Sequence, residues 1–142
     1  MKFSNIKMEF VKRVMLILIL MVLLSCCDIV PSGPPQSVAA VNKSSTELTV
    51  RWQNVLEKDR NGIIQGFKVY YVAVGQFAVD RREKVQEVND GSAVETVVGN
   101  LEKYIEYNIT VLAFTSKGDG PNSTEITART DQDGMDIRYK VG

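Results

Sequence analysis

Near its N-terminus the chain has a continuous apolar run, and after it come short segments in which apolar and polar residues alternate. All 11 residues from 14 to 24 are apolar, and Lys12 and Arg13 stand directly before them. A membrane-spanning helix needs about 20 apolar residues, so this run better fits the hydrophobic region of a signal peptide. The small residues 25–27 follow it, which suits cleavage by signal peptidase. We therefore predict a signal peptide over residues 1–27.

Two other interpretations of this leader remain open. Counted through Val30, the segment reaches 17 residues with one charge, Asp28, and could serve as an uncleaved signal anchor. Residues 23–26 (Leu-Leu-Ser-Cys) resemble a bacterial lipobox, in which the cysteine receives a lipid. All three interpretations export the rest of the chain. A buried core helix is disfavoured because no other segment has the matching helical pattern.

Beyond a Pro- and Gly-containing linker at residues 28–33, the alternation predicts β-strands. It is clearest in residues 48–52, where every second residue is apolar, and in residues 107–113. Turn residues such as Asn61-Gly62 separate the segments. Short strands without helical periodicity predict an all-β antiparallel sandwich, followed by a flexible tail over residues 132–142. The predicted strands cover residues 38–41, 48–52, 67–74, 85–88, 96–98, 107–113 and 124–130.

Over residues 34–131 the sequence resembles the fibronectin type III family. Trp52 stands where that family keeps a core tryptophan on its second strand, and residues 64–71 (IQGFKVYY) are similar to its third strand. Leu101 and Tyr107 keep the family's six-residue spacing, so Tyr107 resembles its tyrosine-corner residue. The resemblance implies an immunoglobulin-like sandwich of seven strands. The expected core residues are Trp52, Phe67, Val69, Tyr71, Leu101, Tyr107, Ile109 and Val111.

Composition argues against catalysis. The chain has no histidine, and its two cysteines, Cys26 and Cys27, lie in the leader. The usual general base, zinc ligand and thiol nucleophile are therefore missing from the predicted domain. Asp131, Asp133 and Asp136 loosely resemble a calcium loop, but no glutamate follows at the needed spacing. We expect no enzyme activity, no metal and no cofactor.

Charge argues against nucleic acid as a partner. The chain holds 17 basic and 17 acidic residues, of which four basic and one acidic lie in the leader. The remainder is slightly acidic and shows no basic stripe that could neutralise phosphates. Membrane contact is expected only through the N-terminal segment, if that segment is uncleaved or lipidated.

Two surface features are candidate functional sites. Three sequons make Asn42, Asn108 and Asn122 candidates for N-glycosylation. Residues Lys117-Gly118-Asp119 lie in the loop where the integrin-binding member of the family carries Arg-Gly-Asp, which makes them a candidate adhesion loop. The alternative is an ordinary hairpin, in which Gly118 and Gly120 supply positive φ while Lys117 and Asp119 project into water.

Three classes of function follow. The favoured one is an extracellular interaction, adhesion or spacer module, secreted or membrane-tethered, whose partners are other extracellular or cell-surface proteins. Such a module could be the N-terminal part of a larger protein. The second is a carbohydrate-related accessory domain of an exported bacterial lipoprotein. An enzyme is the third and the least supported.

Overall fold

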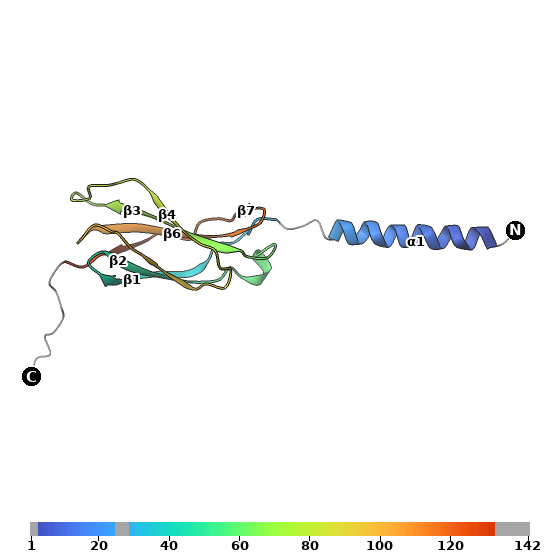
Figure 1. The fold of residues 1–142 in the computed structure, drawn as a ribbon, viewed down its shortest axis with the longest axis horizontal. Coiled ribbons are helices and arrows are strands. Elements are labelled where there is room, and N and C mark those ends of the chain that lie inside the picture. Colours follow the sequence, from blue (N-terminus) through green and yellow to red (C-terminus); the bar gives the residue numbers. More distant parts are fainter. Residues whose placement is uncertain (1–2, 25–28, 133–142) are drawn as a thin grey trace, which may run out of the picture.

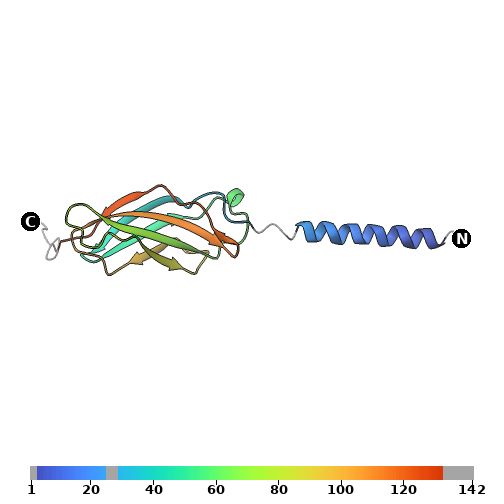
Figure 2. The ribbon, with the colours of Figure 1, turned by 90° about the horizontal axis from the view of Figure 1, so that it is seen from above.

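Alternating apolar side chains bring two antiparallel sheets face to face in the computed structural model, which describes residues 3–24 and 29–132 (Figure 1). The first sheet has the order β1-β2-β5 and the second the order β4-β3-β6-β7, with β8 also paired to β6. Figure 2 shows the long strands running along the domain. The strands are β1 (Gln36–Ser44), β2 (Glu47–Gln53), β3 (Gly66–Val74), β4 (Lys84–Val88), β5 (Glu95–Val98), β6 (Glu106–Thr115), β7 (Gly118–Asp119) and β8 (Ile126–Arg129).

The described residues form eight strands rather than seven because Gly118 and Asp119, which lie in a predicted loop, pair with β6 as the short strand β7. Both β7 and β8 pair with β6, but the pairing shifts by two residues between them. Ser123 fills the gap: its N–H donates to the Val111 carbonyl at 2.8 Å, and its hydroxyl accepts from the Val111 N–H at 3.0 Å. The predicted antiparallel sandwich is therefore confirmed, with the short strand β7 added before the last one.

The core lies between the sheets. Leu48, Val50 and Trp52 point inward from β2 and are buried. The Trp52 ring packs on Phe67 of β3, with ring centroids 5.1 Å apart and planes tilted by 48°. Each fully buried aliphatic side chain stabilises the fold by about 1.5–3 kcal/mol. Of the expected core residues, all but Tyr71 are buried, and Tyr71 is partly buried against the core.

Tyr107 closes the turn before β6. Its hydroxyl accepts a hydrogen bond of 2.8 Å from the backbone N–H of Glu102, and only 3% of the residue is exposed. Burial raises the pKa of Tyr107 above its ordinary value. This is the upstream backbone contact that the resemblance of Tyr107 to a tyrosine-corner residue implies.

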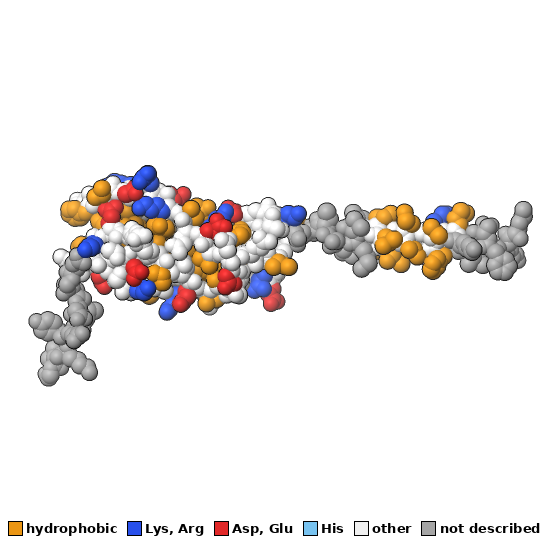
Figure 3. Space-filling model, viewed as in Figure 1, with side chains coloured by type: hydrophobic (Ala, Val, Ile, Leu, Met, Phe, Trp, Pro, Cys, Tyr) orange, Lys and Arg blue, Asp and Glu red, His pale blue; other side chains and the backbone are white. Residues whose placement is uncertain are grey.

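The leader forms a helix, α1 (Phe3–Leu24). The side chains described along it, from Met8 to Leu20, are exposed, and apolar groups cover the visible side of it in Figure 3. No helix within residues 3–24 and 29–132 is long and apolar enough to cross a membrane. The cleavage region and the lipobox cysteine lie outside the described residues, so the fate of the leader stays a prediction.

Candidate functional site

The loop that carries Lys-Gly-Asp is a tight hairpin between β6 and β7. Thr115 pairs with Gly118, so that only Ser116 and Lys117 form the turn, and the Thr115 hydroxyl accepts a bond of 3.2 Å from the Lys117 N–H. Gly118 has φ 141°, in the region that favours glycine. The hairpin chemistry expected for Gly118 is thus present.

Gly120 differs from expectation, because it is not among the described residues with positive φ. Its need for glycine is steric. A Cβ atom at this position would lie 2.8 Å from the Cβ of Pro31 and 3.1 Å from the carbonyl oxygen of Ala113. Pro31 is fully buried. Gly120 therefore allows the chain before the domain to pack directly on the chain after the hairpin.

Asp119 also differs from expectation, because it does not simply project into water. Its carboxylate oxygens accept bonds of 2.8 and 2.9 Å from the Nζ of Lys68 in β3. The same Nζ lies 5.4 Å from the centroid of the Phe114 ring. Hydrogen bonding to Asp119 raises the pKa of Lys68. Lys117 is exposed at the turn, so the hairpin does not present a free cation and a free carboxylate side by side.

Residues 29–33, which we name the entry segment, are hydrogen-bonded to the end of the sandwich that carries the β6–β7 hairpin. The Ile29 N–H donates to the Asn61 carbonyl at 3.0 Å, and the Ser32 N–H donates to the Asp59 carbonyl at 2.8 Å. In return, the Asn61 side chain donates to the Val30 carbonyl at 3.2 Å. The entry segment, the β2–β3 connection and the β6–β7 hairpin therefore form one packed unit.

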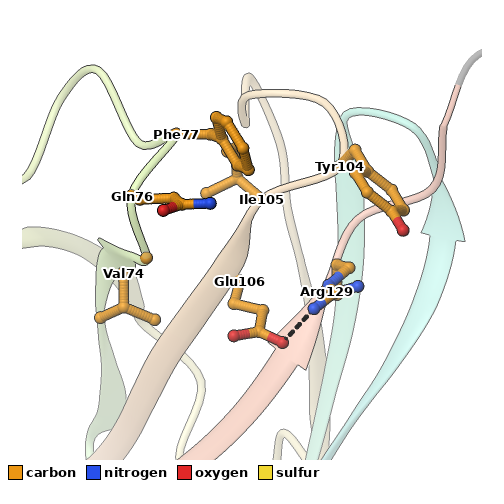
Figure 4. A pocket seen from close by; sticks show the side chains of 8 residues that line it. Val74, Gln76, Phe77, Tyr104, Ile105, Glu106 and Arg129 are labelled. Carbon is orange, nitrogen blue, oxygen red and sulfur yellow. Dashed lines mark hydrogen bonds and ion pairs between the residues drawn. The ribbon is translucent and has the colours of Figure 1, made fainter.

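The opposite end of the domain carries a hollow, which we name the aromatic pocket. It has a volume of 220 Å³ and lies between the start of the β3–β4 loop, the turn before β6 and the end of β8. Figure 4 shows Phe77 and Gln76 on one side and Tyr104 and Arg129 on the other. The lining residues are Val74, Gly75, Gln76, Phe77, Tyr104, Ile105, Glu106 and Arg129.

Glu102 fixes the loop beside this pocket. Its two carboxylate oxygens accept bonds from the N–H groups of Val79 and Asp80, at 3.0 and 2.9 Å. These bonds to the Asp80 and Val79 backbone lower the pKa of Glu102. Asp80 in turn binds Arg82 through both oxygens, and this contact holds the pKa of Asp80 well below its usual range. The β3–β4 loop is thereby tied to the turn that carries Tyr104.

The far wall of the pocket is held by a second group of contacts. Arg129 forms an ion pair with Glu106, and its guanidinium lies 5.0 Å from the centre of the Tyr104 ring. Tyr104 has φ 57°, an uncommon backbone conformation for a bulky residue. Its N–H donates to the Asp131 carbonyl at 3.2 Å.

The sequence reasoning did not identify this pocket. Phe77 and Tyr104, which line it, come from two different loops and are 74% and 54% exposed. The apolar run Phe77-Ala78-Val79 in an otherwise polar loop is the one sequence signal that points to it.

The sequon asparagines differ in their surroundings. Asn42 and Asn122 are exposed. Asn108 lies on the outer face of β6 and is only partly exposed. Its Nδ2 donates to Glu125 at 2.8 Å, and its Oδ1 accepts from the Thr127 hydroxyl at 3.0 Å. Occupancy of all three sites stays a prediction.

The loose calcium-like pattern falls mostly outside the described residues, which include Asp131 but neither Asp133 nor Asp136. Within the part of the chain that the structure describes, no group of three or more His, Cys, Asp or Glu residues is placed to hold a metal ion.

Comparison with known proteins decides the family. The family profile named fibronectin type III domain matches residues 33–129. The chain belongs to the fibronectin type III family. Chicken (Gallus gallus) protein sidekick-1 is 40% identical to it over 105 residues, which cover 73% of this chain and 5% of the relative. Rat (Rattus norvegicus) cell adhesion molecule DSCAM is 38% identical over 104 residues, which cover 73% of this chain and 5% of the relative.

A solved structure agrees. The fn3 domain of human contactin 1 is 30% identical, with a TM-score of 0.62, and the match covers 75% of this chain and 83% of that one. The fibronectin type III resemblance inferred from Trp52, the third strand and Tyr107 is thus confirmed. The chain spans only 5% of the length of the curated relatives, so the match concerns one module of each.

Proposed function

We propose that this fibronectin type III module is an extracellular, non-catalytic interaction domain whose partners are other cell-surface or extracellular proteins. The observation that carries the proposal is the similarity to single modules of sidekick-1 and DSCAM, the second of which is named a cell adhesion molecule. A fold alone does not fix a function, so the surface of the module must supply the contact.

The surface supports an interaction module in two ways. Several apolar side chains remain exposed at loops, among them Ile63 at 82% and Val79 at 89%. The loops that hold them are pinned by hydrogen bonds, such as those of Glu102. Binding to a rigid surface costs less ordering entropy than binding to a mobile one.

The test is a screen for binding at cell surfaces. Residues 28–142, fused to a dimeric tag for avidity, would be applied to cells that each display one cell-surface protein. We expect saturable binding to at least one of them. The control is the same fusion carrying Trp52→Ala, which removes the centre of the core. Binding no different from that control across the panel would contradict the interaction proposal.

Export is tested separately. We propose that the leader is removed, and that protein secreted from eukaryotic cells begins between Cys26 and Gly33. A start after Ile29 would remove the hydrogen bond of the Ile29 N–H to the Asn61 carbonyl. N-terminal sequencing of the secreted protein gives the answer. An intact Met1 on membrane-embedded protein would favour the signal anchor instead.

A further inference from the structure

We propose that the β3–β4 loop, residues 75–83, is a latent processing site. An endoprotease that binds two adjacent cations hydrolyses the peptide bond between Arg82 and Glu83, and two carboxylates of the module hold this site closed. Water adds to the Arg82 carbonyl carbon and the C–N bond breaks, which leaves a carboxylate on Arg82 and a free amine on Glu83. The proposal goes beyond the interaction function, because it concerns a covalent change to the module itself.

Two neighbouring cations mark the bond. Arg81 and Arg82 are the only adjacent pair of basic residues after residue 27. Both residues are exposed, and the side chain of Arg82 is 85% exposed. A protease selects a cation before the cleaved bond with a carboxylate in its S1 pocket, as trypsin does. A second acidic pocket, S2, takes Arg81 and distinguishes this bond from those after isolated exposed cations such as Lys58 and Lys117.

The backbone around the bond can be reshaped without breaking the sheet. Residues 75–83 form neither helix nor strand. The strand that follows them, β4, lies at the edge of its sheet, and within the described chain it pairs with β3 alone. Exposed loops of this kind are preferred sites of proteolytic nicking. By contrast, the cations Arg51, Lys68 and Arg129 lie within paired strands.

The two carboxylates occupy the groups that a protease must bind. Asp80 accepts from the Arg82 backbone N–H at 3.2 Å and from the Arg82 guanidinium at 2.9 and 3.1 Å. Glu102 accepts from the N–H groups of Val79 and Asp80, at 3.0 and 2.9 Å. A substrate bound as an extended strand donates such backbone N–H groups to its partner. Cleavage therefore waits for local opening of the loop, and its rate follows the population of the open form.

The sandwich stays assembled after the cut, because each piece supplies strands to both sheets. In the first sheet, β2 before the cut pairs with β5 after it. In the second, β3 before the cut pairs with β4 and with β6 after it. The ring of Trp52 and the side chain of Ile109, which come from different pieces, belong to the same buried core. The cut therefore opens the loop beside the aromatic pocket and leaves the module folded.

The first test is limited proteolysis of residues 28–142 by kexin, a serine endoprotease that cleaves after paired basic residues. We expect the first cut to fall after Arg82, as read by mass spectrometry of the intact fragments. Arg82→Gln should abolish this cut, and Arg81→Gln should slow it at least about tenfold. A first cut at another bond, or cleavage only in urea that unfolds the domain, would overturn the proposal.

The second test concerns the two carboxylates, through Asp80→Asn and Glu102→Gln. Each substitution removes a charge but keeps the shape of the side chain, and each should raise the rate of cutting after Arg82 about three- to tenfold. Glu87→Gln is the matched control, since Glu87 is an exposed acid on the neighbouring strand β4. Its rate should equal that of the wild type. Equal rates in all three variants would show that no carboxylate holds the site closed, which contradicts the proposal.

The third test asks whether the cut module stays folded. No disulfide can join the two pieces of residues 28–142, because Cys26 and Cys27 precede them. After complete cutting, we expect the pieces to elute together from a gel-filtration column at the volume of the uncut domain and to separate in urea. Pieces that separate without denaturant would also overturn the proposal, because the cut would then destroy the module.

Discussion

The Nζ of Lys68 in β3 lies 2.8 and 2.9 Å from the two carboxylate oxygens of Asp119 in β7, across the intervening strand β6. The pair joins two strands that do not share backbone hydrogen bonds. It also occupies the carboxylate that the Lys-Gly-Asp motif would need for binding to a metal-containing pocket.

Replacing Asp119 by Ala should change folding and cell attachment little. The Asp119 side chain is 40% exposed, and exposed ion pairs contribute between 0 and about 1 kcal/mol. Urea titration at low and high salt measures the difference, which should shrink as salt rises. Lys117→Ala is the matched control and should have no effect. Cells that adhere to the immobilised wild type but not to the Asp119 variant would restore the adhesion-loop interpretation.

Replacing Trp52 by Ala should destabilise the fold by about 3–5 kcal/mol, because the indole fills the centre of the core. Trp52→Phe should lower the free energy of unfolding much less than Trp52→Ala. The Trp52 Nε1 is buried without a protein acceptor among the described residues, and an unpaired buried donor costs about 1–3 kcal/mol that phenylalanine avoids. Urea unfolding of both variants tests this. Equal losses of stability for Trp52→Ala and Trp52→Phe would show that packing volume is not the dominant contribution of Trp52 to the stability of the fold.

Replacing Gly120 by Ala should destabilise the domain, because the added methyl group meets Pro31 at 2.8 Å. Neither neighbour can move freely, since Pro31 is buried and the Ala113 carbonyl accepts from the Gly120 N–H at 2.8 Å. Gly99→Ala is the control. Its nearest atom lies 3.9 Å away on the flexible side chain of Glu47, so thermal unfolding should be unchanged or raised. A Gly120→Ala variant as stable as the wild type would contradict the packing of the entry segment.

Acid should release the β3–β4 loop before the sandwich unfolds. The pKa of Glu102 is lowered in the folded state. The stability that its carboxylate gives to the loop is therefore fully present above the ordinary pKa of 4.5, and it is lost as the pH falls through the folded-state pKa. Exchange rates of the Val79 and Asp80 amides between pH 7 and pH 2, corrected for intrinsic chemistry, report this release. In Glu102→Gln the pH-dependent change at these two amides should disappear. Persistence of the change would assign it to another carboxylate.

Glycan occupancy should differ among the sequons in protein made by a eukaryotic secretory cell. Asn42 and Asn122 are exposed and can carry a glycan without loss of contacts. A glycan on Asn108 must displace its contacts with Glu125 and Thr127. Mass spectrometry of glycopeptides should therefore find lower occupancy at Asn108. Full occupancy at all three sequons would show that the contacts of Asn108 with Glu125 and Thr127 do not limit its glycosylation.

The sequence predicts most of the sandwich because the signals for it are local. The alternation of Leu48, Val50 and Trp52 fixes the face of β2, and the family resemblance of Tyr107 implies the corner contact. The first strand is longer than predicted, Gln36–Ser44 instead of residues 38–41, because polar residues at its ends also pair with β2.

The sequence predicts the candidate sites poorly because they depend on contacts between distant residues. Lys68 and Asp119 are 51 positions apart, and neither has a neighbour in sequence that signals the other. The role of Gly120 depends on Pro31, which the Pro-rich pattern assigned to a linker. The aromatic pocket combines three segments, and its apolar loop residues lie within a polar stretch that carries no periodic pattern.

The bound entry segment sets the length of the tether if the leader remains in a membrane or if Cys26 carries a lipid. Only residues 25–28 separate α1 from Ile29, whose N–H is already fixed to Asn61. Four residues span less than about 20 Å even when extended. The end of the sandwich that carries Lys117 would then be confined close to the bilayer. A protein approaching from a facing cell would first meet the other end, where Phe77 and Tyr104 lie.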